Sequence, residues 1–341
     1  MKLEFLFYRD FKSKILRKVE TMNKRVLVTG GAGFIGSHIC EMYVEEGYDV
    51  LCVDNLSSGK LENLTSLSGH PRFQFIQEDI CHLEGLMHVF ETFRPHVINH
   101  HAAQKSVVTS LEEPRNDLDI NLNGLLCLLE CVQKYPIQSF VYVSSGGALS
   151  KVILGDEKST ESDSPQLISP YAITKYAGEK YLEIYAKEYD FDYTVLRYAN
   201  IYGPRQIPDG ECGVVPIFVN NIVTNQTSVL MTYPDMPRGC TRDYVFVGDV
   251  VEANRLATEK APNMVVNIGT GEEISILDIY QSILKIFNKE VPIRIEGPRA
   301  GDVKRSVLSS KRAQEALGWN ARTNLEEGLL VLKKSMQIES M

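Results

Sequence analysis

The sequence predicts an α/β protein built on a doubly wound parallel sheet, with a smaller C-terminal α/β region. Two observations predict this fold. First, strand-like and helix-like runs alternate from residue 25 to residue 198. Second, the strand-like runs are continuously apolar and rich in β-branched residues, which is typical of parallel strands that are covered on both faces.

The elements follow in order along the chain. Short apolar runs predict strands at 25–29, 49–54, 72–77, 96–101, 139–145 and 192–198. Helical spacing of apolar residues predicts helices at 34–47, 83–93, 116–134 and 171–189. After Asn200 a loop rich in Gly and Pro occupies 201–213. Shorter elements are predicted beyond it: a strand, a turn and a helix at 243–258, a strand and a turn at 265–271, and a helix at 275–287. We expect a first domain at 22–200 and a region at 201–341 that is partly interleaved with it.

The composition excludes some classes of function. The 341 residues are 44% hydrophobic and 23% charged, with a net charge of −8, so we expect no nucleic-acid partner. The seven cysteines are odd in number and form no CxxC motif, which favours reduced thiols in a cytoplasmic protein. Residues 1–21 are basic, with an apolar run too short for a membrane span or a signal peptide. We expect them to be a non-essential extension, and we expect no membrane partner.

A glycine-rich turn follows the first predicted strand. Residues 28–38 read VTGGAGFIGSH, in which Gly30, Gly33 and Gly36 let a backbone turn approach a pyrophosphate closely. Phe34 and Ile35 begin the helix whose N-terminus would face that anion. Asp54 ends the next strand and would accept both hydroxyls of an adenosine ribose, which favours NAD over NADP. Asn55 lies beside it, and Asp79 and Ile80 follow the third strand, either flanking the adenine or serving as an ordinary loop acid and a core residue.

A second constellation lies in SPYAITK at 169–175. Tyr171 and Lys175 are four residues apart, so both side chains share one face of a helix. A free phenol titrates near 10, and we expect the adjacent ammonium and an oxidised nicotinamide to lower the pKa of Tyr171 enough for it to act as a base. The residues His96, His100 and His101 resemble a metal cluster. Successive strand residues point to opposite faces, however, and we expect no metal.

Nine segments in order now identify a resemblance: TGGAGFIGSH, VDNLSSGK, NHHAAQKSV, NLNG, SPYAITK, RYANIYGPRQ, TRDYVFVGDVVEAN, NIGTG and GPRAGDVKRSVL. From about Lys24 to Leu332 the chain resembles the extended short-chain dehydrogenase/reductase family, the NAD-dependent epimerases and dehydratases with a Rossmann-type fold. Within it, the sequence is most similar to UDP-glucose 4-epimerases. The resemblance implies an isomerase of carbohydrate metabolism, including galactose metabolism.

The resemblance also implies roles for individual residues. Tyr171 would be the general base and acid, Lys175 would bind the nicotinamide ribose, and Ser145 would bind the reacting sugar oxygen. The alternative for Ser145 is a cap for the turn that follows it. The cofactor would also contact Ala102, Ala103, Gln104, Asn121 and Tyr198. The substrate would contact Lys105, Asn200, Arg242, Arg299 and Asp302. A homodimer formed through the helices near 116–134 and 171–189 is implied as well.

Several reactions compete on this scaffold: 4-epimerisation, 4,6-dehydration, decarboxylation and reduction of a 4-keto sugar. The related dehydratases carry an Asp–Glu pair after the strand-end hydroxyl and decarboxylases carry a Glu nearby, whereas here Gly146 and Gly147 follow Ser145. Epimerisation needs no further acid, so we expect 4-epimerisation of UDP-glucose and UDP-galactose. Ser306 occupies a position that is a bulky tyrosine in some narrow-pocket epimerases, which favours acceptance of UDP-GlcNAc and UDP-GalNAc too. A non-catalytic NAD-binding regulatory protein is the alternative from another class. The segment 149–169 departs from the family pattern.

Overall fold

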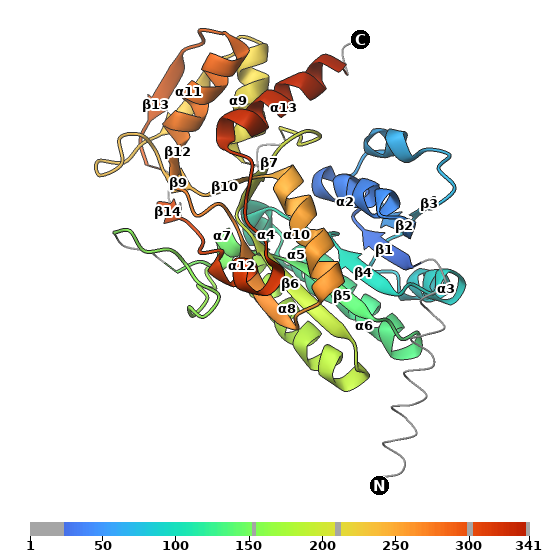
Figure 1. Cartoon of the computed structure of the whole chain (residues 1–341). Helices are drawn as coiled ribbons and strands as arrows, with labels where there is room; N and C mark the ends of the chain where they lie inside the picture. Colours follow the sequence, from blue (N-terminus) through green and yellow to red (C-terminus); the bar gives the residue numbers. More distant parts are fainter. Residues whose placement is uncertain (1–23, 152–154, 209–212, 299–302, 339–341) are drawn as a thin grey trace.

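The computed structural model of the protein describes residues 24–151, 155–208, 213–298 and 303–338, so the predicted extension at 1–21 lies outside them. Its centre is a sheet of seven parallel strands in the order β11-β6-β5-β4-β1-β2-β3 (Figure 1). The predicted doubly wound parallel sheet is therefore confirmed. The strands are β1 (Arg25–Thr29), β2 (Asp49–Asp54), β3 (Phe73–Gln77), β4 (Val97–His100), β5 (Ser139–Ser145), β6 (Asp192–Tyr198) and β11 (Met264–Ile268).

Helices cover both faces of this sheet. On one face α3 (Leu83–Phe93), α6 (Gly124–Lys134) and α8 (Pro170–Tyr189) share an apolar core with side chains such as Leu27, Ile98 and Phe140. On the other face α2 (Phe34–Glu45) packs on Val26 and Val28, while α10 (Val247–Lys260) and α12 (Lys311–Leu317) pack nearer to β6 and β11. Because successive strand residues point to opposite faces, continuous apolar strands serve both cores at once.

The strand order places a crevice at the carboxyl ends of the central strands. From β1 the chain winds outward through β2 and β3, then returns to β4 on the other side of β1. The connections on the two sides diverge above the carboxyl ends of β1 and β4, and ligands of open α/β sheets bind at such a switch point. The segments after β1, β2, β4 and β5 all converge there.

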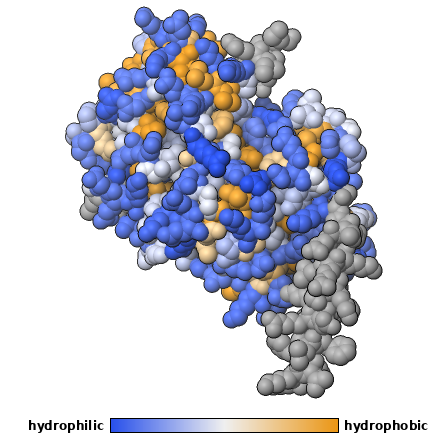
Figure 2. Space-filling view, in the orientation of Figure 1, coloured by the Kyte–Doolittle hydropathy of each residue, from blue (hydrophilic) through white to orange (hydrophobic). Residues whose placement is uncertain are grey.

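A smaller region stands beside the carboxyl ends of the strands. Its core is formed by α9 (Val214–Val223), α11 (Ile276–Phe287) and α13 (Leu325–Ile338), with β8 (Ser228–Met231) paired to β13 (Ile293–Glu296). Figure 2 shows that apolar residues gather over this upper part of a face that is otherwise mostly hydrophilic. Three further short pairings complete the fold: β7 (Asn200–Tyr202) pairs with β10 (Tyr244–Phe246), and β9 (Thr241–Arg242) pairs with both β12 (Ile274–Ser275) and β14 (Arg305–Ser306).

Most predicted elements match the structure to within one or two residues, but the helix predicted at 116–134 differs. It is three pieces: α5 (Pro114–Leu118), a π-helical turn η2 (Asp119–Asn123) and α6. A π-turn inserts one extra residue into a helix and is frequent at functional sites. The short strand β7 lies in the segment that was predicted as loop. The last strand of the sheet, β11, comes from beyond residue 200, and the domain boundary at that residue stays a prediction.

None of the described helices is both long and apolar enough to cross a membrane. The six described cysteines are all free thiols, namely Cys40, Cys52, Cys81, Cys127, Cys131 and Cys240.

Candidate active site

A cavity of about 790 Å³ opens at the switch point. Its walls come from the segments that follow β1, β2, β3, β4, β5 and β6, together with one face of α8. The structure brings most of the predicted site residues together here. The predicted residues that line the cavity are Gly30, Gly33, Phe34, Ile35, Gly36, Asp54, Asn55, Asp79, Ile80, Ala102, Ala103, Gln104, Lys105, Ser145, Tyr171, Lys175 and Tyr198.

The glycine-rich turn forms one end of the cavity. Gly30 has a φ of +67°, and its amide donates to the carbonyl oxygen of Val53 over 2.9 Å. A Cβ on Gly30 would lie 2.6 Å from the amide nitrogen of Ala102, and one on Gly36 would collide with the carbonyl oxygen of Gly30. Gly33 caps α2 without a side chain, so the first amides of that helix face the cavity. This cradle fits the pyrophosphate of a dinucleotide.

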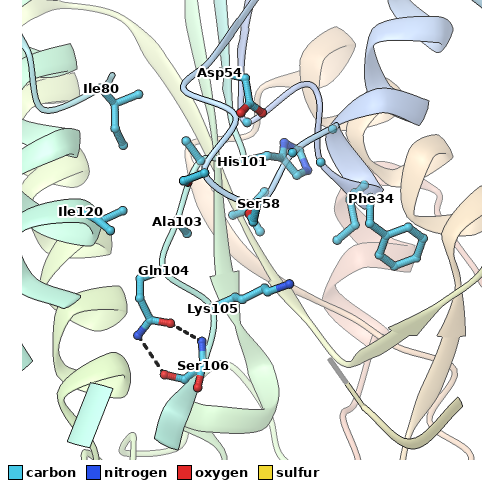
Figure 3. Close-up of a pocket in the computed structure, with 18 of the residues that line it drawn as sticks. Phe34, Asp54, Ser58, Ile80, His101, Ala103, Gln104, Lys105, Ser106 and Ile120 are labelled. Atoms are coloured by element: carbon cyan, nitrogen blue, oxygen red, sulfur yellow. Dashed lines mark hydrogen bonds between the residues drawn. The ribbon is translucent and has the colours of Figure 1, made fainter. Parts of the chain in front are cut away.

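Asp54 stands at the end of β2, beside this cradle. Its two carboxylate oxygens accept hydrogen bonds from the amides of Ala32 (2.9 Å) and Leu56 (2.8 Å), which fix its orientation at the cavity wall. The side-chain amide of Asn55 donates to Asp79 over 2.8 Å, so the ends of β2 and β3 are tied together. An acid held in this way suits the ribose hydroxyls of NAD. Figure 3 shows Asp54 and Ile80 on the wall of the cavity.

Tyr171, Lys175 and Ser145 meet on the opposite side of the cavity. Ser169 caps α8 by accepting from the amide of Ala172 over 3.1 Å, and Pro170 begins the helix, so Tyr171 lies in its first turn. Ser145 ends β5 and hydrogen-bonds the Tyr171 phenol. Its hydroxyl also accepts from the amide of Ala148 over 3.2 Å, as the cap of the short helix α7 (Gly146–Leu149). The capping role and the contact with Tyr171 therefore coexist.

Burial moves the pKa values of Tyr171 and Lys175 in opposite directions. Burial raises the pKa of Tyr171 to about 12, because the hydrogen bond with Ser145 lowers it by less. Burial lowers the pKa of Lys175 to about 8, against the opposing effect of Asp117 and Glu179. Lys175 donates to the carbonyl oxygen of Val143 over 3.1 Å. The expected lowering of the phenol pKa thus differs from what the protein's own groups produce, because desolvation of the phenolate dominates.

A buried polar chain supports the wall beside Tyr198. The Tyr198 hydroxyl accepts from the side-chain amide of Asn254 over 2.7 Å and lies 3.3 Å from Nε2 of His101. Burial lowers the pKa of His101 to about 3, so this imidazole is neutral near pH 7. His101 lines the cavity (Figure 3), a role not predicted for this residue, although it lies within the quoted motif NHHAAQKSV.

The three clustered histidines have separate surroundings. His96 accepts from the amide of Arg25, His100 bonds the hydroxyl of Thr29, and His101 bonds Tyr198. Among the described residues no group of three or more His, Cys, Asp or Glu side chains could hold a metal ion.

Five predicted site residues are not among those that line the cavity. Asn121 is buried behind its wall, and Asn200 and Arg242 stand toward the smaller region. Arg299 and Asp302 lie outside the described residues. A Cβ on Gly147 would be 3.9 Å from both the Asn200 Oδ1 and the Ser306 Oγ, so the three positions adjoin. Ser306 pairs with Arg242 in the register of β14 and β9. Asn200 and Arg242 are both predicted to contact the substrate. They lie in β7 and β9, on the side of the site where Ser306 of β14 also stands.

Other lining residues were not predicted. The segment after β2 contributes the side chains of Ser57 and Ser58, and the loop after β7 contributes Arg205 and Gln206. Both segments fall within the quoted motifs VDNLSSGK and RYANIYGPRQ, so these motifs could have been used to predict the four residues as part of the site. Arg205 is held by Glu41 over 2.6 Å and by Ser37 over 3.1 Å, which fixes the loop against α2.

Comparisons with known proteins agree with this geometry. Residues 26–269 match the family described as the NAD dependent epimerase/dehydratase family. A putative UDP-glucose 4-epimerase of Methanocaldococcus jannaschii is 39% identical over 311 residues, which are 89% of this chain and 95% of that protein. The dTDP-D-glucose 4,6-dehydratase of Bos taurus is 30% identical over 334 residues, which are 93% of this chain and 90% of that protein.

Solved structures give the same picture. The UDP-glucose 4-epimerase of Thermotoga maritima, solved with UDP-glucose, superposes with a TM-score of 0.87 at 42% identity, over 93% of this chain and all of that one (100%). The UDP-glucose 4-epimerase of Thermus thermophilus, solved in complex with NAD, superposes with a TM-score of 0.83 at 38% identity, over 92% of this chain and 99% of that one.

Proposed function

The chain belongs to the NAD-dependent epimerase/dehydratase family, and we propose that it is an NAD-dependent isomerase that interconverts UDP-glucose and UDP-galactose by 4-epimerisation. The cofactor is NAD. The glycine cradle at Gly30, Gly33 and Gly36 and the carboxylate of Asp54 fit its pyrophosphate and ribose. A Cβ at Gly30 would clash with the backbone of Ala102, and one at Gly36 with the carbonyl oxygen of Gly30, so the close approach of the backbone depends on glycine at both positions.

In this proposal the residues at the β5 side carry out proton transfer. Bound NAD supplies a reversible hydride acceptor for carbon 4 of the sugar. Tyr171 takes the proton of the 4-hydroxyl group as that carbon is oxidised to the ketone. Ser145 holds the reacting oxygen, and the ammonium of Lys175 favours the phenolate form. After the keto sugar turns over, Tyr171 returns the proton to the oxygen as carbon 4 is reduced on its other face, so no net oxidation results.

One observation carries the choice of reaction. Within the described part of the chain, the carboxylates that line the cavity are Asp54, which ends β2, and Glu78 and Asp79, which follow β3. The strands β1 and β4 separate them from β5 and Tyr171. Beside Ser145 the chain instead has Gly146 and Gly147. Dehydration needs a further acid and base at the sugar, whereas epimerisation needs space for the keto sugar to rotate.

The same small residues support a wider sugar range. The hydroxymethyl side chain of Ser306 and the bare backbone of Gly147 adjoin Asn200 on the side facing the smaller region. We propose that UDP-GlcNAc and UDP-GalNAc also fit, because neither position projects a large side chain.

We also propose a cytoplasmic homodimer. The free thiols of the described cysteines support the compartment. Several apolar side chains are at least 38% exposed on the helices expected to form the interface, near 116–134 and 171–189, and on the helix at 107–112 that packs against them, which supports association of two copies through these helices. These residues are Val107, Leu111, Leu118, Ile173, Tyr181, Ile184 and Tyr189.

The test uses the purified protein with UDP-glucose, UDP-GlcNAc and the matching dTDP- and GDP-hexoses. We expect UDP-galactose to form from UDP-glucose until both sugars reach equilibrium, with no net accumulation of NADH. A 4-keto-6-deoxy product would indicate a dehydratase, and stoichiometric consumption of NADH would indicate a reductase. Failure to convert any sugar of the panel would contradict the proposal.

A further inference from the structure

Asp117 is a buried acid directly behind the wall of the candidate active site. It lies in α5 with an exposed fraction of 0%, although carboxylates are rarely buried completely. Its Oδ2 accepts from the hydroxyl of Thr174 over 2.7 Å. Its Oδ1 accepts from the side-chain amides of Gln104 (2.8 Å) and Asn121 (3.0 Å). All three donors are neutral groups, so the hydrogen bonds satisfy the carboxylate without cancelling its charge.

These hydrogen bonds join three segments of the site. Gln104 belongs to the loop after β4 that lines the cofactor cavity, and its side chain turns back onto the backbone of Ser106 (Figure 3). Asn121 lies in the π-turn η2 and clamps this loop, accepting from the Gln104 amide over 2.9 Å and donating to its carbonyl oxygen over 3.0 Å. Thr174 immediately precedes Lys175 on α8, and its hydroxyl lies 3.1 Å from the carbonyl oxygen of Tyr171. Asp117 therefore touches the cofactor loop and the turn that carries Tyr171 and Lys175.

Asp117 is also the charge that acts most strongly on this pair. The groups that face Lys175 are Asp117 from α5, Glu179 from α8, the ring of Tyr142, and the imidazoles of His100 and His101. Burial keeps both imidazoles neutral. The charge of Glu179 is offset by the guanidinium of Arg197, with which it forms a buried ion pair. Asp117 has no such partner among its three donors: burial raises its pKa, its hydrogen bonds oppose that change, and the positive charge that also opposes it is Lys175 itself.

We propose that Asp117 is a positioning residue for the proposed epimerase: it holds the cofactor loop against the Tyr171–Lys175 turn and supplies the negative charge that keeps Lys175 protonated. This inference rests on the proposed function for its catalytic consequence only. Removal of the charge lowers the pKa of Lys175, since Asp117 raises it. It also lowers the pKa of Tyr171, which Asp117 raises in the same way. Loss of the Asp117 charge therefore lowers the pKa values of both Lys175 and Tyr171.

The test is Asp117→Asn, which keeps the shape of the side chain. An asparagine Oδ1 can still accept from Gln104 and Asn121, while its amide can donate to Thr174, whose hydroxyl then turns to the carbonyl oxygen of Tyr171. The first readout is the affinity for NAD measured by calorimetry across pH, because we expect Lys175 to hold the cofactor best as a charged donor. For the wild type we expect affinity to fall as pH rises through about 8. In the variant we expect the midpoint to shift about 1 pH unit lower.

The second readout is the pH profile of kcat/KM for UDP-glucose, whose acidic and alkaline limbs should both move to lower pH in Asp117→Asn. The matched control is Asp119→Asn, which removes an exposed carboxylate two residues along the chain and should leave both midpoints in place. An unshifted NAD midpoint in Asp117→Asn would overturn the electrostatic role. Because that readout needs no turnover, it stays decisive if the protein proves not to be an epimerase.

A second variant tests the positioning role separately from the charge of Asp117. It also keeps the proposal testable if Asp117→Asn does not fold. Thr174→Val removes the link to α8 but leaves the carboxylate in place. We expect a fall in kcat of about tenfold, with the NAD midpoint kept within a few tenths of a pH unit. A kcat equal to that of the wild type would overturn the positioning role.

Discussion

Glu179 and Arg197 form a buried, two-pronged ion pair beneath the candidate active site. Nε and one terminal nitrogen of the guanidinium donate to the two carboxylate oxygens over 2.8 and 2.7 Å, and the hydroxyl of Ser144 adds a third hydrogen bond of 2.6 Å. Glu179 lies one turn beyond Lys175 on α8, while Arg197 and Ser144 are register partners in β6 and β5. The ion pair therefore fixes the helix that carries Tyr171 and Lys175 onto β6, and the Ser144 hydrogen bond fixes it onto β5, the strand that carries Ser145.

Glu179→Gln should destabilise the fold by about 3–5 kcal/mol, because it leaves the charge of Arg197 buried without a counter-charge. Urea denaturation measures this loss. The matched control is Glu183→Gln on the same helix, which breaks an exposed pair with Lys180 and should cost less than about 1 kcal/mol. Equal losses in the two variants would show that burial of the first pair has no energetic consequence.

Tyr171→Phe should lower kcat by a factor of about 10² to 10⁴ or more, since it removes the proton-transferring group. The fold should persist, because the change keeps the aromatic ring in place and removes the hydrogen bond with Ser145. Conversion of UDP-glucose to UDP-galactose measures the rate, and circular dichroism and bound NAD serve as controls. Activity within tenfold of the wild type would remove Tyr171 from its proposed role.

Gly36→Ala should sharply reduce the NAD retained by the purified protein. The added methyl group would collide with the carbonyl oxygen of Gly30, so the turn must open at the place where we expect the pyrophosphate. We expect at least a tenfold loss in affinity, measured by calorimetry. Gly297→Ala is the control, because no described atom lies within 4 Å of the Cβ that it adds. An affinity for NAD equal to that of the wild type would contradict the proposal that this glycine turn binds the pyrophosphate.

Ser306→Tyr should narrow the sugar range. Ser306 is 4% exposed and adjoins Gly147 and Asn200, so a phenol there would fill space beside the proposed sugar site. We expect kcat/KM for UDP-GlcNAc to fall at least tenfold relative to that for UDP-glucose. If the wild type does not turn over UDP-GlcNAc, the proposed wider range is refuted, and if the variant loses both substrates equally, Ser306 does not discriminate between them.

The sequence predicted the sheet and most of the cavity because both depend on local patterns. Continuous apolar strands, glycine spacing and the four-residue separation of Tyr171 and Lys175 are all readable along the chain. The interior polar network was not readable, since Asp117 bonds Gln104 directly only once the fold brings α5 against the loop after β4, and its other partner Asn121 lies in a π-turn that looks like ordinary helix in the sequence. The pKa of Tyr171 was expected to fall for a related reason: spacing gives the neighbouring ammonium, whereas desolvation depends on packing from the whole fold.

Lys175→Met should stabilise the protein from which NAD has been removed. The folded-state pKa of Lys175, about 8, lies below its ordinary value of 10.5, so keeping the side chain protonated costs the fold about 3 kcal/mol below pH 8. Loss of the hydrogen bond to Val143 offsets about 1 kcal/mol of this, leaving a net gain of about 2 kcal/mol.

The sign of the pH dependence follows from the same shift. Between pH 8 and 10.5 the unfolded wild type binds more protons than the folded wild type, so wild-type stability rises with pH and the advantage of Lys175→Met disappears. Urea denaturation of both proteins at pH 6.5, 8, 9 and 10 measures the difference. The control is Lys180→Met, which changes an exposed lysine on the same helix. Its stability relative to the wild type should not fall between pH 8 and 10 as that of Lys175→Met does. A Lys175→Met protein that is less stable than the wild type at every pH would mean that the ammonium is held without cost, and that its partners, Asp117 first among them, outweigh its burial.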